Sequence, residues 1–217
     1  MSAWQSSSPG ELVEALALEL GRGLPGRAAY RTMVPELAYG RHCGPVPDSA
    51  RRAAVLVALH WTEFGWAIPA MLRPVTMRAH ADQVSLPGGV IESGETAVAT
   101  ALREFEEELG APTGELQVLG SLTPVFVFIS NFEVTPILAI SPHMLEFHPN
   151  MHEVAAVVEL HLSRLTDPAV RGSHLIRRQQ LAFRVPHFAI AGHQVWGATS
   201  LILAEFASLL AERSPRN

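Results

Sequence analysis

The chain has 217 residues, of which 48% are hydrophobic and 17% are charged, and its formal net charge is −5. This length and apolar content predict one folded domain with a substantial core and exclude a disordered chain. The negative charge argues against the basic surfaces that hold nucleic acid or anionic lipid, so we expect neither a nucleic-acid nor a membrane partner.

Cys43 is the single cysteine, which excludes an intramolecular disulfide and a cysteine-built zinc site. The longest apolar runs, such as 53–59, are far shorter than the roughly 20 residues of a membrane-spanning helix. The N-terminal segment lacks the basic start and apolar middle of a signal peptide, and the C-terminal residues match no retention signal. We therefore expect a cytoplasmic protein.

The first predicted element is a helix over 8–20, for which Ser8 is the expected cap. Residues 21–49 are rich in Gly, Pro and Arg and lack a sustained apolar period, which predicts an irregular arm over the surface of the domain. We accordingly divide the chain into an N-terminal helix and arm, 1–50, and a main domain, 51–213.

The main domain shows a mixed order of strand and helix patterns. Strands are predicted at 53–59, 66–72, 116–122, 133–140, 154–160 and 181–185. Helices are predicted at 96–109 and 198–212, the second as an amphipathic closing helix. Strand pairs that alternate with helices without a regular βαβ repeat indicate an α/β fold with a mixed sheet between helices.

The stretch LPGGVIESGETAVATALREFEEELGA, at 86–111, carries the chemically informative residues. Gly88 and Gly89 permit unusual backbone angles and a close approach of the backbone to a ligand. In the helix that follows, Thr96 is the expected cap and Gly110 the expected stop. The apolar stripe expected to face the core consists of Val98, Leu102, Phe105 and Leu109.

Three glutamates of this helix, Glu104, Glu107 and Glu108, are spaced so that we expect their carboxylates to share a face turned away from the apolar stripe. Like charges at this spacing destabilise a helix, and an oxygen-liking cation relieves the repulsion. Mg²⁺ and Mn²⁺ prefer carboxylates, water and substrate phosphate oxygens. Arg103 is spaced to orient Glu107 by a fork-like pair. Taken alone, an acidic helix face is more often plain solvated surface.

The same stretch resembles the box of the Nudix hydrolase family, whose fixed positions are matched by Gly89, Glu95, Arg103, Glu104, Glu107, Glu108 and Gly110. At two softer positions, Phe105 and Ala111 replace the aliphatic residues usual in the family. The resemblance implies a Nudix-type α/β/α sandwich over 51–213. It also implies hydrolysis of a nucleoside diphosphate linked to another group.

The resemblance further implies roles for individual residues. The metal-binding set for Mg²⁺ or Mn²⁺ would consist of Glu104, Glu107, Glu108 and the backbone carbonyl of Gly88. Arg103 and Glu95 would be the orienting pair. Cations held there would neutralise the diphosphate and activate a water for in-line attack on phosphorus. The base that deprotonates this water stays open between Glu104 and Glu153.

The segment before the box, at 73–89, resembles the signature of the coenzyme A diphosphatase branch of the family. The matching positions, implied to bind coenzyme A, are Arg73, Arg78, His80 and Gln83. Guanidinium groups suit this task because they bind phosphate oxygens bidentately. The departures from the branch are Pro74 for a small residue, Asp82 for a glycine, Leu86 for an aromatic residue and Ala156 for a second glutamate.

Three functions stay open. The first is hydrolysis of coenzyme A, free or acylated, to 3′,5′-ADP and 4′-phosphopantetheine or its acyl form. The second is hydrolysis of another nucleoside diphosphate derivative, such as ADP-ribose, a dinucleotide or a nucleotide sugar. The third is a Nudix module that binds a nucleotide without turning it over.

Two further features leave alternatives. His148, His152 and Glu153 form a His-x3-His-Glu group, but we expect a loop there and therefore discount a transition-metal site. The arm at 21–49 either completes a homodimer or caps the substrate pocket.

Overall fold

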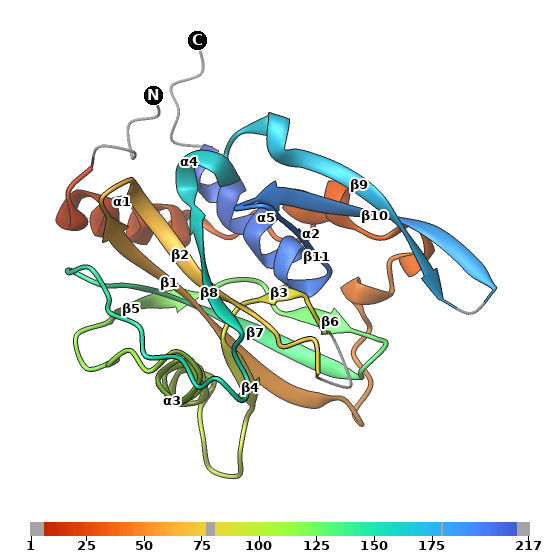
Figure 1. Cartoon of the computed structure of the whole chain (residues 1–217), viewed down its shortest axis with the longest axis horizontal. Coiled ribbons are helices and arrows are strands. Elements are labelled where there is room, and N and C mark those ends of the chain that lie inside the picture. The colour runs from red at the N-terminus through yellow and green to blue at the C-terminus, as the bar shows by residue number, and fades with distance from the viewer. Residues whose placement is uncertain (1–6, 77–80, 179, 212–217) are drawn as a thin grey trace.

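The computed structural model describes residues 7–76, 81–178 and 180–211. Within these ranges the chain forms a large mixed sheet, a smaller antiparallel sheet and the helices around them (Figure 1). The large sheet contains β1 (Arg51–Thr62), β2 (Gly65–Leu72), β3 (Val84–Ser85), β4 (Gly88–Val90), β5 (Gln117–Ser121), β6 (Val125–Val127), β7 (Phe132–Ile140) and β8 (Ala156–His161). The small sheet contains β9 (Arg171–Arg178), β10 (Leu181–Ile190) and β11 (His193–Trp196).

The helices are α1 (Pro9–Arg22), α2 (Arg27–Tyr30), α3 (Ala97–Leu109), α4 (Leu162–Leu165) and α5 (Ala198–Ala211), with 3₁₀ turns at Arg31–Met33, Glu36–Ala38, Arg41–Cys43 and Pro168–Val170. The predicted cap of α1 is confirmed, because the Ser8 hydroxyl accepts a hydrogen bond from the Glu11 backbone N–H. Each strand and helix predicted from the sequence is present with shifted ends. No helix in the described part of the chain is both long and apolar enough to cross a membrane.

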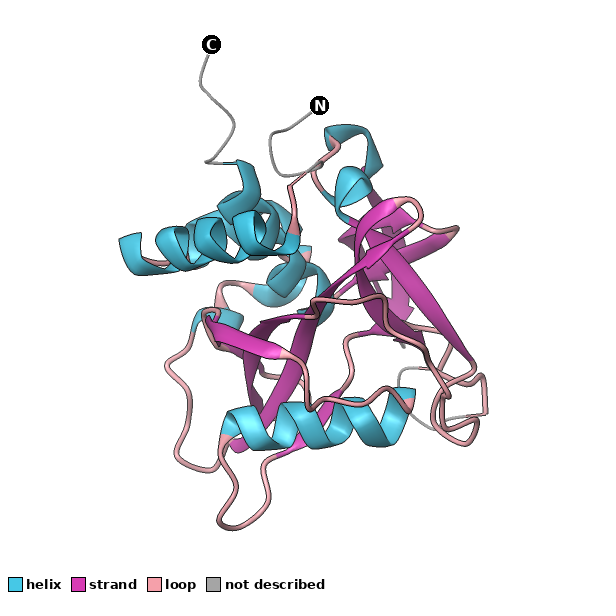
Figure 2. Ribbon diagram, turned by 90° about the vertical axis from the view of Figure 1, so that its left-hand side faces the viewer, coloured by secondary structure: helices cyan, strands magenta, loops and turns pink. Residues whose placement is uncertain are grey.

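Strand β1 lies in the middle of the large sheet, and its continuous apolar sequence reflects burial on both faces. Its side chains alternate between two cores: Ala53, Val57 and Leu59 belong to the larger, and Ala54, Leu56 and Ala58 to the smaller. β1 runs parallel to β7 and antiparallel to β2 and β4. Helix α3 covers one face of the sheet, and α1 and α5 lie on the other (Figure 2). The predicted mixed sheet between helices is therefore confirmed.

Helix α5 departs from the prediction of an amphipathic closing helix. Its side chains from Thr199 to Ala207 are all buried, as are Leu209 and Leu210. Helices α1, α2 and α4 pack around it together with β6 and β11. A helix that is enclosed on every side is apolar on every side, which explains why α5 has no polar face.

The arm between α1 and β1 is more ordered than predicted and does not simply lie over the surface. It forms α2 and three of the 3₁₀ turns. Tyr30 and Met33 are part of the larger core and are each 1% exposed. The buried carboxylate of Glu205, on α5, accepts hydrogen bonds from the backbone N–H of Gly26 at 2.9 Å and from the Thr123 N–H and hydroxyl at 2.9 and 2.6 Å. The arm is thus fastened to the centre of the molecule.

Candidate active site

Helix α3 is delimited as the sequence predicts. The Thr96 hydroxyl accepts a hydrogen bond from the Ala99 backbone N–H at 3.2 Å, and Gly110 ends the helix in the left-handed region with φ 66°. The apolar stripe is displaced from the predicted one, since Ala101 is fully buried with Phe105 and Leu109, whereas Val98 is 36% exposed. The small Ala101 lets the helix lie close to β1, which explains the shift.

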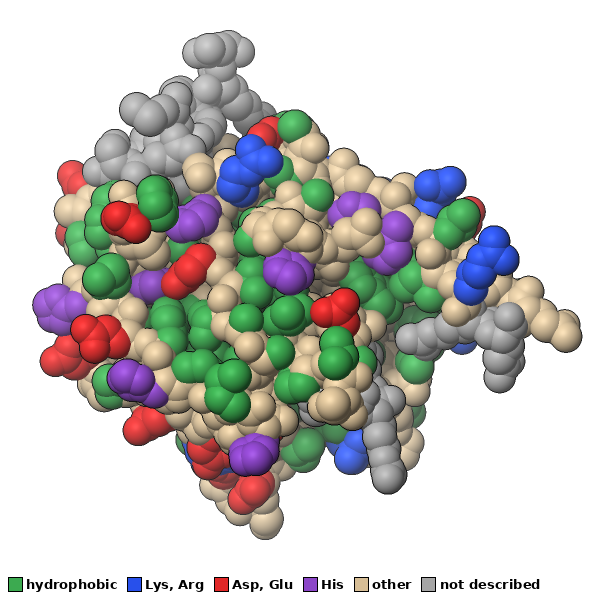
Figure 3. All heavy atoms as spheres, in the orientation of Figure 1, with side chains coloured by type: hydrophobic (Ala, Val, Ile, Leu, Met, Phe, Trp, Pro, Cys, Tyr) green, Lys and Arg blue, Asp and Glu red, His purple; other side chains and the backbone are tan. Residues whose placement is uncertain are grey.

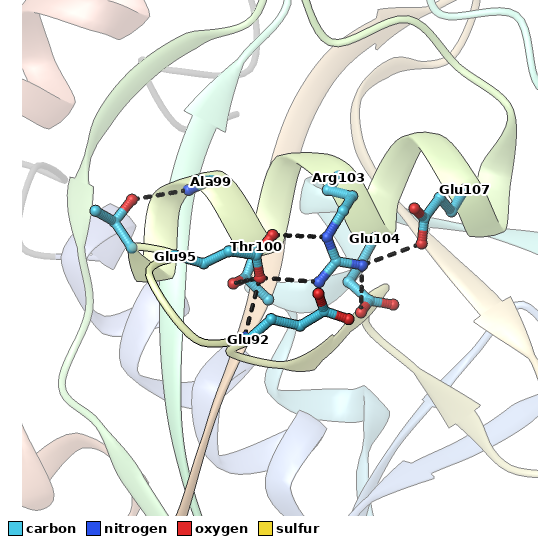
Figure 4. Close-up of polar contacts among 8 residues, drawn as sticks. Glu92, Glu95, Ala99, Thr100, Arg103, Glu104 and Glu107 are labelled. Atoms are coloured by element: carbon cyan, nitrogen blue, oxygen red, sulfur yellow. Dashed lines mark hydrogen bonds and ion pairs between the residues drawn. The ribbon is translucent and has the colours of Figure 1, made fainter.

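Arg103, near the middle of α3, is the centre of an ion-pair network that joins the helix to the loop before it (Figure 4). Its Nε and Nη2 donate to the two carboxylate oxygens of Glu95, at 2.8 and 3.1 Å, and its Nη1 contacts Glu104 at 2.8 Å and Glu107 at 3.1 Å. The predicted pair of Arg103 with Glu107 is present, but through a single nitrogen. The fork instead binds Glu95, on the loop before the helix, which bears out the expected pairing of Arg103 with Glu95.

Glu95 is held as an anion by its surroundings. Hydrogen bonds from Arg103, from the Thr100 hydroxyl and from the Glu92 backbone N–H lower the pKa of Glu95 to about 2. In the space-filling view, acidic side chains lie next to the tip of the loop between β4 and α3, at the bottom of the molecule (Figure 3). The contacts of Arg103 connect this loop to the side chains of α3, so loop and helix present one rigid acidic surface.

The three glutamates of α3 do not share one outward face, contrary to the prediction. Glu108 is 5% exposed, whereas the side chains of Glu104 and Glu107 are 17% and 59% exposed. Glu108 is buried because its carboxylate accepts a hydrogen bond at 2.9 Å from the backbone N–H of Gly88, which brings it under β4. On α3, the Glu108 carboxylate therefore faces the sheet, whereas the Glu107 carboxylate faces solvent.

Gly88 and Gly89 allow β4 to lie against both β1 and α3. A Cβ on Gly88, whose φ is 154°, would collide with the Ala54 carbonyl oxygen, and one on Gly89 would collide with the Glu104 carboxylate. Close packing against the β1 backbone therefore requires glycine at position 88, whereas a side chain at position 89 would displace the Glu104 carboxylate. They keep the backbone of β4 next to the carboxylates of Glu104 and Glu108.

Glu108 has an unusual protonation equilibrium. Burial is the main cause that raises the pKa of Glu108 to about 7, and the negative charges of Glu104 and Glu153 add to the rise. The Gly88 N–H and the positive charge of Arg73 act in the opposite direction. A carboxyl group that is hard to ionise next to other carboxylates gains from a nearby cation.

Glu153 approaches Glu108 from a separate segment of the chain. The backbone N–H groups of His148 and Asn150 donate to the carbonyls of Leu109 and Glu108, which fastens the loop before β8 to the end of α3. This segment is not helical, so the expectation of a loop through His148 and His152 is confirmed. The loop brings Glu153 near enough to Glu108 to affect its pKa.

The donor chemistry of this region fits a hard divalent cation. No group of three or more His, Cys, Asp or Glu side chains, among the residues that the structure describes, is arranged so that it could hold a metal ion. Mg²⁺ is commonly bound by one or two carboxylates and completed by water and substrate phosphate oxygens. Glu104 and Glu108 supply such a pair, since the negative charge of Glu104 acts on the buried carboxyl group of Glu108.

The segment upstream of the box was expected to bind the substrate. Arg73 and Gln83 lie opposite each other, since the Arg73 N–H donates to the Gln83 carbonyl at 3.0 Å. Asp82, where the related branch has glycine, has φ 58°, a left-handed conformation that Asp tolerates better than most residues. The backbone therefore follows the path that a glycine would allow. Arg78 and His80 lie outside the described residues.

A cavity of about 1030 Å³ opens beside β4. Its lining includes Arg73, Gln83, Gly88 and Gly89, and its walls come from the arm, from the turn after β6, from β10 and from the start of α5. Sequence reasoning missed the wall residues outside the motifs, such as Leu37, His42 and Phe183. Of the two roles expected for the arm, a dimer contact or a cap on the pocket, the second agrees with its place in the cavity wall. No local sequence pattern predicts which of its residues line the cavity.

Comparison with known proteins gives concordant results. The family model described as NUDIX domain matches residues 66–175. The chain is 35% identical over 164 residues to the uncharacterized Nudix hydrolase NudL of Photorhabdus laumondii, a match that covers 74% of this chain and 85% of that protein. NudL of Cronobacter sakazakii is 35% identical over 173 residues, covering 75% and 84%. The crystal structure of a Nudix hydrolase from M. smegmatis, RenU, matches with TM-score 0.54 at 17% identity, covering 77% of this chain and 90% of that one, which shows a shared fold.

Proposed function

Since this chain belongs to the Nudix hydrolase family, and is a pyrophosphohydrolase acting on phosphoanhydride bonds, we propose that its substrate is coenzyme A or a derivative of it. The products are 3′,5′-ADP and 4′-phosphopantetheine or its acyl form. One observation carries the choice of substrate: Arg73, the first residue of the coenzyme A diphosphatase signature, lines the cavity beside β4 and its charge acts on Glu108. A diphosphate between Arg73 and the α3 carboxylates would be held from both sides.

Nudix hydrolases generally use divalent metal ions, and we propose that Glu104 and Glu108, with the Gly88 carbonyl, begin the cation site; Glu107, whose side chain is 59% exposed and paired with Arg103, would have to turn toward the cation to join them. Mg²⁺ or Mn²⁺ bound there would supply charge neutralisation and a water of lowered pKa. The chain itself orients these ligands. Gly88 N–H fixes one oxygen of Glu108, and Arg103 restrains Glu104 and Glu107 while Glu95 holds Arg103.

Proton transfer from the attacking water requires a carboxylate within hydrogen-bond reach of it. We assign this role to Glu104 or Glu153, both of which lie near enough to Glu108 to raise its pKa. Substitution to glutamine separates the candidates. The variant that lacks the true base loses most of its turnover number, and the acidic limb of its pH–rate profile disappears. A variant that lacks only a cation ligand needs a higher metal concentration for activity.

The test is an incubation of the protein with coenzyme A and Mg²⁺ or Mn²⁺, followed by separation of the products. We expect both products with wild type and a loss of several orders of magnitude in rate with Glu108→Gln. ADP-ribose, a dinucleotide and a nucleotide sugar are assayed in parallel. Faster cleavage of any of these would assign the enzyme to another Nudix substrate, and binding without turnover of all of them would make it a binding module.

A further inference from the structure

The cavity beside β4 is larger and more apolar than phosphate binding needs. Its volume of about 1030 Å³ is at the upper end of the range for pockets that enclose a whole drug-sized ligand. Apolar side chains dominate its walls, among them Leu37, Val127, Phe128, Phe183 and Ile202. Since Gly88 and Gly89 also line it, the cavity begins at the backbone that carries the proposed cation site.

Polar atoms without a partner are concentrated in this wall. The His42 Nδ1, the Arg73 Nε and the Ser85 Oγ are buried and make no hydrogen bond, and all three residues line the cavity. They are three of the five such side-chain atoms among the described residues. Buried polar groups nearly always have a partner in folded proteins. Because each of these atoms has almost no accessible surface, a ligand would reach them only after the side chains turn toward the cavity. The apolar wall itself indicates a ligand with much apolar surface.

We propose that this cavity receives the non-nucleotide half of the substrate, and that this half is a long apolar chain interrupted by amide groups. The inference rests on the proposed function and deepens it: among coenzyme A species, the enzyme prefers acyl thioesters with long chains to the free thiol. A sugar, a ribose or a second base would leave many of its hydroxyl and ring groups facing apolar side chains, which is costly.

Part of the cavity wall comes from the arm, outside the matched family domain. Leu37 and His42 come from 3₁₀ turns that precede residues 66–175, the range of the NUDIX match. His42 is 7% exposed and its ring packs edge-on against Tyr30, a core residue, at 5.8 Å between ring centroids. The wall is therefore anchored in the core and is part of the folded pocket.

The test measures how affinity depends on chain length. Dissociation constants for coenzyme A and its acetyl, octanoyl and dodecanoyl thioesters are determined by calorimetry without divalent cations, and Michaelis constants with Mn²⁺. Burial of a methylene is worth about 0.8 kcal/mol, so even partial burial of the dodecanoyl chain lowers the dissociation constant by at least about tenfold relative to coenzyme A. The Michaelis constant is expected to fall in parallel.

Leu37→Glu places a charge in the wall and is expected to abolish the dependence on chain length. The matched control is Leu24→Glu, because Leu24 lies on the same arm, is 37% exposed and does not line the cavity. Should Leu37→Glu fail to fold, Leu181→Glu serves instead, since Leu181 lines the cavity and is 63% exposed. Retention of the chain-length dependence in the cavity variant that folds would overturn the assignment of the wall.

The outcomes separate the two proposals. Hydrolysis of coenzyme A with no effect of chain length on either constant overturns this inference and leaves the proposed function standing. Chain-length-dependent binding without hydrolysis of any coenzyme A species overturns the proposed function and supports the cavity assignment. Tighter binding of ADP-ribose than of every acyl thioester overturns both.

Discussion

Glu108 combines a cost in stability with the cation-binding role that we propose for it. Its pKa is raised to about 7 in the folded protein, above the ordinary value of 4.5. The folded state therefore holds the proton more tightly than the unfolded state does. Stability falls as pH rises from about 4.5 through 7, because the native protein must then ionise a buried group that ionises easily once unfolded.

We expect Glu108→Gln to be more stable than wild type at about pH 8.5 in the presence of EDTA, by up to about 3 kcal/mol, because glutamine carries no charge to bury. The difference should vanish near pH 4.5. Urea unfolding at both pH values checks this. A variant equally stable or less stable than wild type at the higher pH would show that the carboxylate is already compensated without a cation.

A substitution at Gly89 tests the packing between β4 and α3. In Gly89→Ala the new methyl group overlaps the Glu104 carboxylate, so either the strand or the carboxylate must shift. A displacement of about 1 Å in an active site can reduce the rate by roughly 100-fold, and we expect a loss of this order in turnover with the fold retained, as circular dichroism would report.

The control for this substitution is Gly114→Ala. A Cβ on Gly114 meets no atom within 4 Å, and the residue lies in the loop after α3. We expect wild-type turnover and stability. Equal activity of the two alanine variants would contradict the proposed closeness of Gly89 to a working Glu104.

At the scale of elements, the long regular segments could be predicted and the connections could not. β1 and α3 have strong apolar patterns, α3 also has defined caps, and both lie where the sequence indicates. β3 and β4 have two and three residues, too few for any periodicity to register. β9, RGSHLIRR, has few apolar residues and is a strand because it pairs with β10.

The positions of the site residues follow the same division. The spacing of the box predicts which carboxylates lie on α3, but the burial of Glu108 depends on β4, a strand that the sequence does not indicate. The fork between Arg103 and Glu95 likewise depends on the path of a loop. The arm enters the pocket through contacts between residues far apart in sequence, for which a single sequence carries no local signal.

The connection between the arm and α5 can be tested through Glu205, which is 1% exposed. Glu205→Gln keeps the size of the side chain but turns one acceptor oxygen into a donor that faces the N–H groups of Gly26 and Thr123. A buried donor left without an acceptor costs about 1–3 kcal/mol, and we expect a loss of that size in urea unfolding. Glu14→Gln, at an exposed position of α1, should change stability by less than about 0.5 kcal/mol; equal losses in both variants would exclude a special role for Glu205.

For the whole molecule, the large sheet places two unlike surfaces on either side of β4. Carboxylates of α3 lie on the side of the smaller core, and the apolar cavity opens on the side of Ala53 and Val55. Gly88 and Gly89 line the cavity and also lie against the carboxylates of Glu108 and Glu104. A substrate with an anionic diphosphate and an apolar chain fits this border. Cations would join its diphosphate to the acidic helix, and its chain would lie in the cavity.

In the proposed function, the carboxylates of α3 hold divalent cations against a phosphoanhydride. Titration of Mn²⁺ into the protein by calorimetry, with and without coenzyme A, tests it most directly when wild type is compared with the Glu104→Gln/Glu108→Gln double variant. We predict that Mn²⁺ binds wild type more tightly once coenzyme A is present, and that the double variant loses this binding. Equal Mn²⁺ binding by the two proteins, or none by wild type with coenzyme A present, would contradict the account.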